Sequence, residues 1–275
     1  MKKNKFLPLI SLYLIIYKVQ TKFNNLFYKI LNYSQIIREG FWLAVLSEKS
    51  ILSINERFYN NSIKYIDENL NRSSLFEWEE EMINKFFLNS KKIMVLGSGG
   101  GREIYALSKK DYEVEGFECN KTLVAHSQNF IKKEGLTSSI AYVEPNHCPD
   151  NNKIYDGIIL GWGLYNHVKG RVMRINLLKE INTHLEIGSH VLLSYWWSNQ
   201  NVDLYCKKIE IVNRFFCKIF FTKPIEKGDR ITMHSGHYFT FQEVQDELKM
   251  AGFSVVYESA KQYGHTVAQK TEHLY

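Results

Sequence analysis

Proline and cysteine are both scarce in this chain of 275 residues. Its four prolines exclude long proline-rich linkers. The four cysteines form no C-x-x-C pair, and their spacing supports neither a zinc site nor a disulfide framework. They are Cys119, Cys148, Cys206 and Cys217. Reduced thiols are the simplest interpretation, and they favour a cytoplasmic location.

Acidic residues are absent before Glu39, although the formal net charge of the whole chain is only +6. Six lysines occupy that stretch: Lys2, Lys3, Lys5, Lys18, Lys22 and Lys29. Such a basic, aromatic start could contact nucleic acid or anionic lipid, or it could be a solvated helix face. We favour the solvated face and expect no nucleic-acid partner, because the chain has no arginine-rich or RNP-like motif.

A small-x-small cleavage site is also missing after the apolar run Phe6 to Tyr17, which otherwise resembles the core of a signal peptide. The run is too short to span a bilayer. We therefore expect a helix, and residues 1–22 either pack on the domain or make peripheral contact with a membrane surface.

The apolar content of 45% is sufficient for a large core. Residues 1–90 are predicted to be helical throughout and to form an N-terminal cap, with Ser73 or Ser74 capping the helix that follows. Residues 91–275 are predicted to form one further domain, in which residues 200–235 are a lid insertion. Short apolar runs alternate there with helical segments, which predicts parallel βαβ units. Phe253–Glu258 and Thr266–Gln269 are predicted to form a hairpin that adds an antiparallel strand.

A glycine-rich turn follows the first predicted strand, in the order Gly97-Ser98-Gly99-Gly100-Gly101. Glycines let the backbone approach a ligand closely, and the following helix start directs free N–H groups at it. Glu118 ends the second predicted strand, where a carboxylate can accept both ribose hydroxyl protons. A dinucleotide site requires G-x-G-x-x-G. The turn does not fit this pattern. Counted from Gly97, the third glycine position is Arg102, and counted from Gly99 it is Ile104.

These motifs resemble the class I (Rossmann-like) methyltransferases that use S-adenosylmethionine (SAM). Gly99 and Gly101 match the first two glycines of the family's G-x-G-x-G turn, whereas Gly97 replaces its acid and Glu103 its last glycine. Tyr155 to Leu160 resembles the fourth strand, and Ala251-Gly252-Phe253 resembles the entry to the sixth. The resemblance implies an α/β fold with a seven-stranded, mostly parallel sheet, an antiparallel C-terminal strand and an α-helical N-terminal cap.

The resemblance also implies a cofactor site for SAM. Its predicted residues are Gly97, Ser98, Gly99, Gly101, Arg102, Glu103, Glu118, Cys119, Asn146, Gly161 and Trp162. Arg102 could meet the methionine carboxylate or be a solvated residue at the helix start, and Glu103 could replace the missing acid. Glu144 or Asn146 could contact adenine, or Pro145 could simply mark a turn. Tyr59 and Phe76-Glu77-Trp78 are expected to belong to a cap over the cofactor.

Three histidines are candidate bases or acceptor contacts: His167, His234 and His237. Each could equally be structural, and no third ligand at a fixed spacing supports a metal site at His234 and His237. Tyr195-Trp196-Trp197 could form the wall of an acceptor pocket. The expected activity is methyl transfer from SAM to a small molecule. A non-catalytic SAM-binding scaffold, a dinucleotide oxidoreductase and a membrane-surface enzyme acting on lipid or envelope precursors are the alternatives.

Overall fold

The computed structural model describes residues 7–272. The lysines at positions 2, 3 and 5 and the start of the predicted apolar helix therefore lie outside the described residues. Within that range the contacts divide the chain into two units. One consists of Met1–Val45 with Lys207–Ile225, and the other of Leu46–Cys206 with Glu226–Tyr275.

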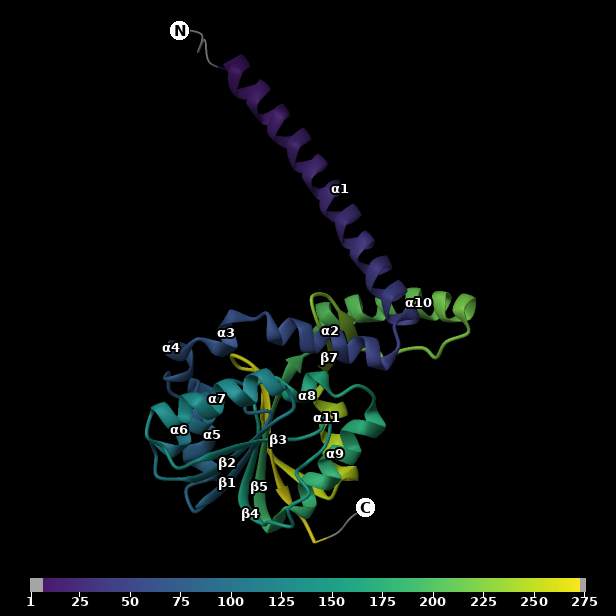
Figure 1. The fold of residues 1–275 in the computed structure, drawn as a ribbon. Helices are drawn as coiled ribbons and strands as arrows, with labels where there is room; N and C mark the ends of the chain where they lie inside the picture. Colours follow the sequence, from purple (N-terminus) through teal and green to yellow (C-terminus); the bar gives the residue numbers. More distant parts are fainter. Residues whose placement is uncertain (1–6, 273–275) are drawn as a thin grey trace. The chain divides into compact units, whose positions relative to one another are not determined.

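The larger unit is built on a twisted sheet with strands on both sides of β1 (Figure 1). Strands β1 to β5 pair in parallel in the order β3-β2-β1-β4-β5. Their bounds are Lys92–Leu96, Glu113–Glu118, Ser139–Tyr142, Tyr155–Leu160 and Leu185–Trp197. β9 (Gly264–Lys270) then pairs antiparallel with both β5 and β8 (Phe253–Ser259). The predicted mostly parallel sheet with its antiparallel C-terminal strand is confirmed.

The sheet has nine strands rather than the predicted seven. The two additional strands, β6 (Asp229–Ile231) and β7 (Ser235–Phe239), form a hairpin. β5 runs on to Trp197, and β7 pairs with its last two residues. The sequence did not predict this hairpin because its strands are short and their histidine and glycine residues break the apolar alternation.

Helices pack against both faces of the sheet, so alternate residues of β1 enter different cores. Ile93 and Val95 join the helices α5 (Glu77–Phe86), α6 (Arg102–Ser108) and α7 (Lys121–Lys133) in one apolar cluster. Met94 and Leu96 join α8 (Leu164–His167), α9 (Arg171–Thr183) and α11 (Phe241–Met250) in the other. Burial on both faces explains the uninterrupted apolar strands.

Three further helices precede α5 in this unit: α2 (Glu48–Asn60), α3 (Ile63–Ile66) and α4 (Glu68–Asn71). The predicted serine cap of α5 is wrong, because Phe76 takes the N-cap position and its N–H donates to Glu79 at 2.7 Å. Helix α11 begins with a capping box, since Thr240 and Glu243 each accept from the other's backbone N–H.

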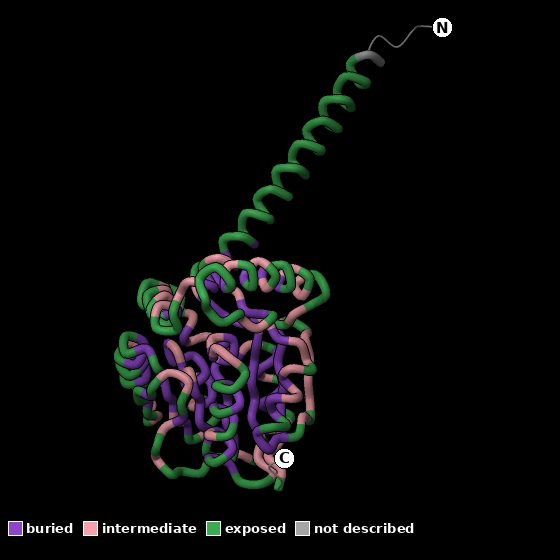
Figure 2. The backbone as a smooth tube through the Cα atoms, turned by 90° about the vertical axis from the view of Figure 1, so that its right-hand side faces the viewer, coloured by how far each residue is buried: buried purple, intermediate pink, exposed green. Residues whose placement is uncertain are grey.

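The smaller unit contains α1 (Leu7–Val45) and most of α10 (Gln200–Phe220). Near the end of α1, Gly40 allows close packing, because a Cβ there would lie 2.7 Å from Val212 Cγ1. Asn213 Nδ2 donates to the Gly40 carbonyl oxygen, and the rings of Phe41 and Phe216 meet edge to face. Most of α1 before that point is exposed (Figure 2). Among the described residues, no helix combines the length and the apolar character needed to cross a bilayer.

Candidate functional site

The glycine turn joins β1 to α6 and has the conformation that a ligand-binding turn requires. Gly97, Gly99 and Gly101 have φ angles of +76°, +52° and +99°, which side chains other than glycine's disfavour. A Cβ built on Gly99 would meet only a Tyr65 ring atom, at 3.9 Å. The space above this residue is therefore open to a ligand.

Two other glycines permit close backbone contacts around the turn. A Cβ on Gly161, at the end of β4, would lie 2.1 Å from the Gly97 carbonyl oxygen. A Cβ on Gly100 would lie 1.9 Å from the Tyr65 carbonyl oxygen, so this glycine lets α3 cover the turn. Gly161 therefore supports the turn and lines neither cavity, and its predicted contact with the cofactor stays a prediction.

Glu118 lies where β2 ends, directly beside the glycine turn. Its Oε2 accepts from the Gly99 N–H at 2.9 Å, and its Oε1 accepts from the Asn120 N–H at 2.8 Å. Burial raises the pKa of this carboxyl, and the backbone donors oppose that shift. Each carboxylate oxygen keeps a second lone pair, so Glu118 can also accept from two ligand hydroxyls.

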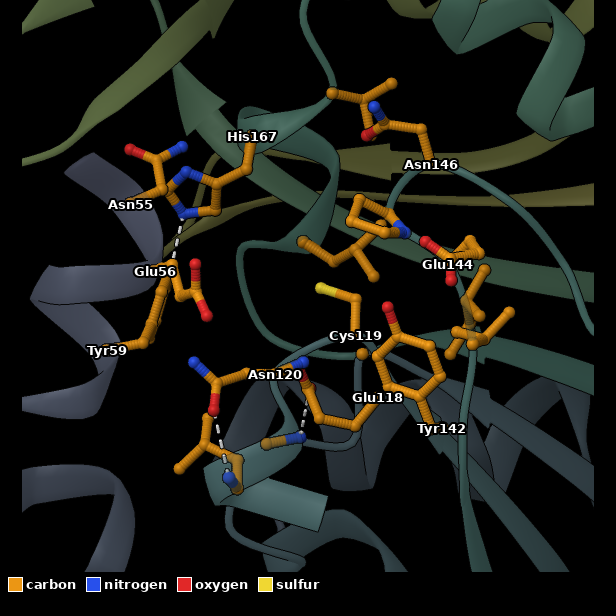
Figure 3. A pocket seen from close by; sticks show the side chains of 18 of the residues that line it. Asn55, Glu56, Tyr59, Glu118, Cys119, Asn120, Tyr142, Glu144, Asn146 and His167 are labelled. Carbon is orange, nitrogen blue, oxygen red and sulfur yellow. Dashed lines mark hydrogen bonds between the residues drawn. The ribbon is translucent and has the colours of Figure 1, made fainter. Parts of the chain in front are cut away.

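A cavity of about 390 Å³ lies between α2, the glycine turn, the ends of β2 and β3 and helix α8, a size typical of small-molecule sites. Figure 3 shows Glu56 and Tyr59 on one side of it and Glu118, Cys119 and Tyr142 on the other. Seven of the predicted site residues line it: Gly97, Gly99, Glu118, Cys119, Asn146, Trp162 and His167. Glu144 and Pro145 line it as well. The structure thus brings together residues from well-separated parts of the chain.

A second, smaller cavity of about 40 Å³ lies on the other side of the glycine turn. Ser98, Arg102 and Glu103 line it, together with Lys64 and Phe76. The buried Ser98 Oγ and Trp162 Nε1 have no hydrogen-bond partner among the described residues. Both atoms belong to residues that line a cavity, where a ligand can satisfy them.

Arg102 lines the small cavity, and its charge is paired in a buried ion-pair cluster. Its Nη1 and Nη2 donate to the two carboxylate oxygens of Glu79 at 2.7 and 2.8 Å, and Nη2 also donates to Glu103 at 2.7 Å. The guanidinium stacks on Phe76 at 3.9 Å. The alternative of a solvated residue is wrong, because Arg102 is buried. Its contact with a methionine carboxylate stays a prediction. Lys64, whose ammonium lies 4.2 Å from the centre of the Trp162 ring, also lines the small cavity and makes no ion pair with Glu79 or Glu103.

His167 is the one of the three candidate histidines that lines the cavity. Its Nδ1 lies 2.8 Å from the Ser235 carbonyl oxygen, so this nitrogen carries the hydrogen. Its Nε2 lies 2.7 Å from the Tyr59 hydroxyl. Burial lowers the pKa of His167 to about 4, so the ring is neutral at pH 7. A neutral ring with hydrogen on Nδ1 accepts at Nε2, and Tyr59 therefore donates.

The other two histidines lie outside both cavities. The ring of His234 packs against those of Phe58, His167 and Trp196. The ring of Trp196 also contacts His167, but Trp196 does not line the large cavity and so does not form the expected wall of the pocket.

His237 is buried and donates from Nδ1 to Asp229 at 2.7 Å. Within the described range, Glu226, Asp229 and His237 form the one group with spacing suited to a metal ion. Asp229 also accepts from the Glu226 N–H, and Glu226 pairs with Arg174 at 2.9 Å. Because the Arg174 guanidinium already pairs with a carboxylate of this group, we interpret the group as an internal ion-pair network.

Several residues of the site were not predicted from the sequence. Leu52, Asn55, Glu56 and Tyr59 all line the large cavity, and of these only Tyr59 was expected. Their spacing of i, i+3, i+4 and i+7 places them on one face of α2, a pattern that could have identified this face as a set. Lys64 and Tyr65 come from the short helix α3, which has no comparable pattern.

Comparisons of the fold find several solved methyltransferase structures. A SAM-dependent methyltransferase from Methanosarcina mazei is 18% identical, with a TM-score of 0.57, over 73% of this chain and 100% of the other. The 1,6-didemethyltoxoflavin-N1-methyltransferase of Burkholderia thailandensis is 13% identical, with a TM-score of 0.58, over 83% and 92% of the two chains. A SAM-bound amino pentose methyltransferase from Micromonospora echinaspora is 13% identical, with a TM-score of 0.51, over 82% and 98%. No family model matches the chain, and no curated protein matches its sequence.

Proposed function

The chain has the fold of the class I SAM-dependent methyltransferases, and we propose that it transfers a methyl group from SAM to a small-molecule acceptor. The observation that carries this proposal is that the open glycine turn and Glu118 lie side by side and line one cavity of about 390 Å³. Two of the solved neighbours, the 1,6-didemethyltoxoflavin-N1-methyltransferase and the amino pentose methyltransferase, act on small molecules. That supports the same class of acceptor here.

The two cavities suit the two ends of SAM. Glu118 would accept from the ribose hydroxyls, and the segment Glu144 to Asn146 would lie beside the adenine in the large cavity. On the other side of the turn, Lys64 would meet the methionine carboxylate, and Glu103 would meet its ammonium group. The carboxylate and the ammonium group of the methionine part would then each meet a side chain of opposite charge.

Chemically, SAM supplies a methyl group already activated by the sulfonium, so the protein has to align an acceptor and keep out water. On the acceptor side, Tyr59 and His167 would do this, since both line the large cavity. Because Tyr59 donates its hydrogen to His167, the lone pairs of its oxygen can accept a hydrogen from an acceptor O–H or N–H. This hydrogen bond from the acceptor to Tyr59 would orient the acceptor, so that a lone pair of its nucleophilic oxygen or nitrogen faces the methyl group of SAM.

Calorimetric titration with SAM, S-adenosylhomocysteine and NADH in parallel tests the proposal. We expect saturable binding of the two adenosyl compounds and none of NADH. Binding of NADH alone would contradict the proposal and favour an oxidoreductase. SAM binding without turnover across a broad acceptor screen would favour a non-catalytic scaffold.

Replacing Lys64 with methionine is expected to weaken SAM binding about 10-fold, because one charge-assisted contact at an exposed site is lost. Adenosine, which has no methionine part, should bind with unchanged affinity. Both affinities are measured by calorimetry. Lys85→Met is the matched control, because the Lys85 ammonium also lies over aromatic rings, those of Phe86 and Tyr257. Equal losses for SAM and adenosine in Lys64→Met would contradict the assignment.

The burial of neutral His167 predicts how stability depends on pH. Its pKa is about 4 in the folded protein and 6.5 in an unperturbed histidine, so the unfolded chain binds more protons between these values. Wild type therefore loses stability on acidification that His167→Gln does not lose. The free energy of unfolding of wild type minus that of the variant should fall by up to about 3 kcal/mol as the pH is lowered from 7 to 4. Urea unfolding of both proteins at several pH values measures this difference. A difference that stays constant or grows on acidification would refute the buried neutral histidine.

A further inference from the structure

The smaller unit exposes an unusual amount of apolar surface. Along α1, large apolar side chains from Leu9 to Tyr33 are 42–68% exposed. They are Leu9, Ile10, Leu12, Tyr13, Leu14, Ile15, Ile16, Tyr17, Val19, Phe23, Leu26, Phe27, Tyr28, Ile30, Leu31 and Tyr33. On α10, Ile211, Phe215 and Ile219 follow one another at four-residue spacing and are at least 50% exposed. Exposed apolar surface on this scale marks an interaction site.

Positive charge is concentrated in the same unit. Met1–Val45 and Lys207–Ile225 together contain twelve lysines and arginines but only two acids, Glu39 and Glu210, which gives a net charge of +10. The whole chain carries +6, so the larger unit carries −4. The excess of positive charge in this protein therefore belongs entirely to the unit that exposes the apolar side chains.

Three lysines of α1 lie along one line of the helix, the lysine stripe. Successive residues of an α-helix are rotated by about 100°, so Lys18, Lys22 and Lys29 fall within about 40° of one another around the axis. Asn25 and Asn32 extend the same stripe. Apolar and tyrosine side chains occupy most of the other directions, with polar residues such as Gln20, Asn24 and Gln35 between them. A basic line beside exposed apolar side chains is typical of helices that lie in the plane of a membrane interface.

We propose that the unit Met1–Val45 with Lys207–Ile225 binds the surface of an anionic phospholipid bilayer. The lysine stripe contacts the lipid phosphates, and the apolar side chains of α1 enter the boundary between headgroups and acyl chains. Charge complementarity selects this partner over a second copy of the chain. Two such units would bring charges of +10 together with almost no acid to pair them.

The test is cosedimentation of the full chain with vesicles. One set contains phosphatidylcholine and phosphatidylglycerol in equal parts, and the other contains phosphatidylcholine alone. We expect binding to the first set that is at least about 100-fold weaker in the triple variant Lys18→Glu, Lys22→Glu, Lys29→Glu. The matched control makes the same charge change on exposed lysines of the larger unit, Lys132→Glu, Lys179→Glu and Lys261→Glu, and should bind as wild type does.

A second variant isolates the apolar contribution. Leu14→Asn, Ile15→Asn and Ile16→Asn leave the charge unchanged and should also weaken vesicle binding, with circular dichroism confirming that the helix is retained. Equal binding of wild type to both vesicle sets would overturn the proposal, and so would equal losses in the triple variant and its control. Failure to bind vesicles, with a dimer in analytical ultracentrifugation that the apolar variant dissociates, would assign the surface to a second copy.

Discussion

Replacing Glu118 with alanine is expected to weaken SAM binding by at least about 100-fold. Each hydrogen bond to a charged group contributes about 1.5–3 kcal/mol, and Glu118 would make two of them to the ribose. The substitution also leaves the N–H groups of Gly99 and Asn120 without their acceptors. Calorimetry measures the loss, and adenosine should be affected as strongly as SAM, since the ribose is common to both.

Glutamine is not a conservative replacement at this position. Both carboxylate oxygens of Glu118 accept from a backbone N–H, so the NH₂ group of a glutamine would face one of these donors. We therefore expect Glu118→Gln to lose most of the affinity as well.

Glu115 is the matched control for both substitutions. It lies on the same strand, β2, but its carboxylate pairs with Lys153 and accepts from Tyr155, away from both cavities. Glu115→Gln should leave SAM affinity unchanged. If Glu118→Ala bound SAM as tightly as Glu115→Gln does, another residue would have to bind the ribose.

The fold could be predicted from the sequence where the signal is local. The strand, glycine turn and helix from Lys92 to Ser108 follow one another directly, and buried parallel strands appear as uninterrupted apolar runs. Glu118 was identified for the same reason, because it ends the next strand. The predicted hairpin of β8 and β9 also joins strands that are neighbours in the sequence.

The parts of the site that were not predicted depend on packing between distant segments. Lys64 reaches the small cavity because α3 packs on Gly100, and no pattern in the sequence connects those two positions. The partner of His167 is Tyr59, 108 residues earlier in the chain. The assignments of Gly97, Gly99, Glu118 and the other predicted residues to SAM stay predictions, although the structure brings most of them to one of two adjacent cavities.

Arg102 illustrates how local context can mislead. At the start of a helix beside the glycine turn, an arginine is well placed to bind an anion. Nothing in the sequence pattern indicates that α5 places Glu79 beside it, and in the resulting pair the side chains of Arg102 and Glu79 are 6% and 4% exposed. The anion that Arg102 binds is therefore one of the protein's own carboxylates, and its role is to fix α5 against the glycine turn.

Replacing Arg102 with methionine is consequently expected to lower the free energy of unfolding by about 3–5 kcal/mol, because Glu79 and Glu103 would stay buried without their counterion. Urea unfolding measures the change. Arg72→Met is the control, since Arg72 pairs with Glu68 and Glu134 but its side chain is 35% exposed, and pairs open to solvent contribute little to stability.

The dependence of this loss on pH separates lost charge from lost packing. Burial already raises the pKa of Glu79, and removing Arg102 removes the group that opposes this shift. A carboxyl whose folded pKa is above its unfolded value favours folding at low pH and opposes it as the pH rises. The stability lost in Arg102→Met should therefore shrink as the pH falls from 7 toward 4. A loss that is the same at both pH values would mean that Arg102 stabilises the turn by packing on Phe76 alone.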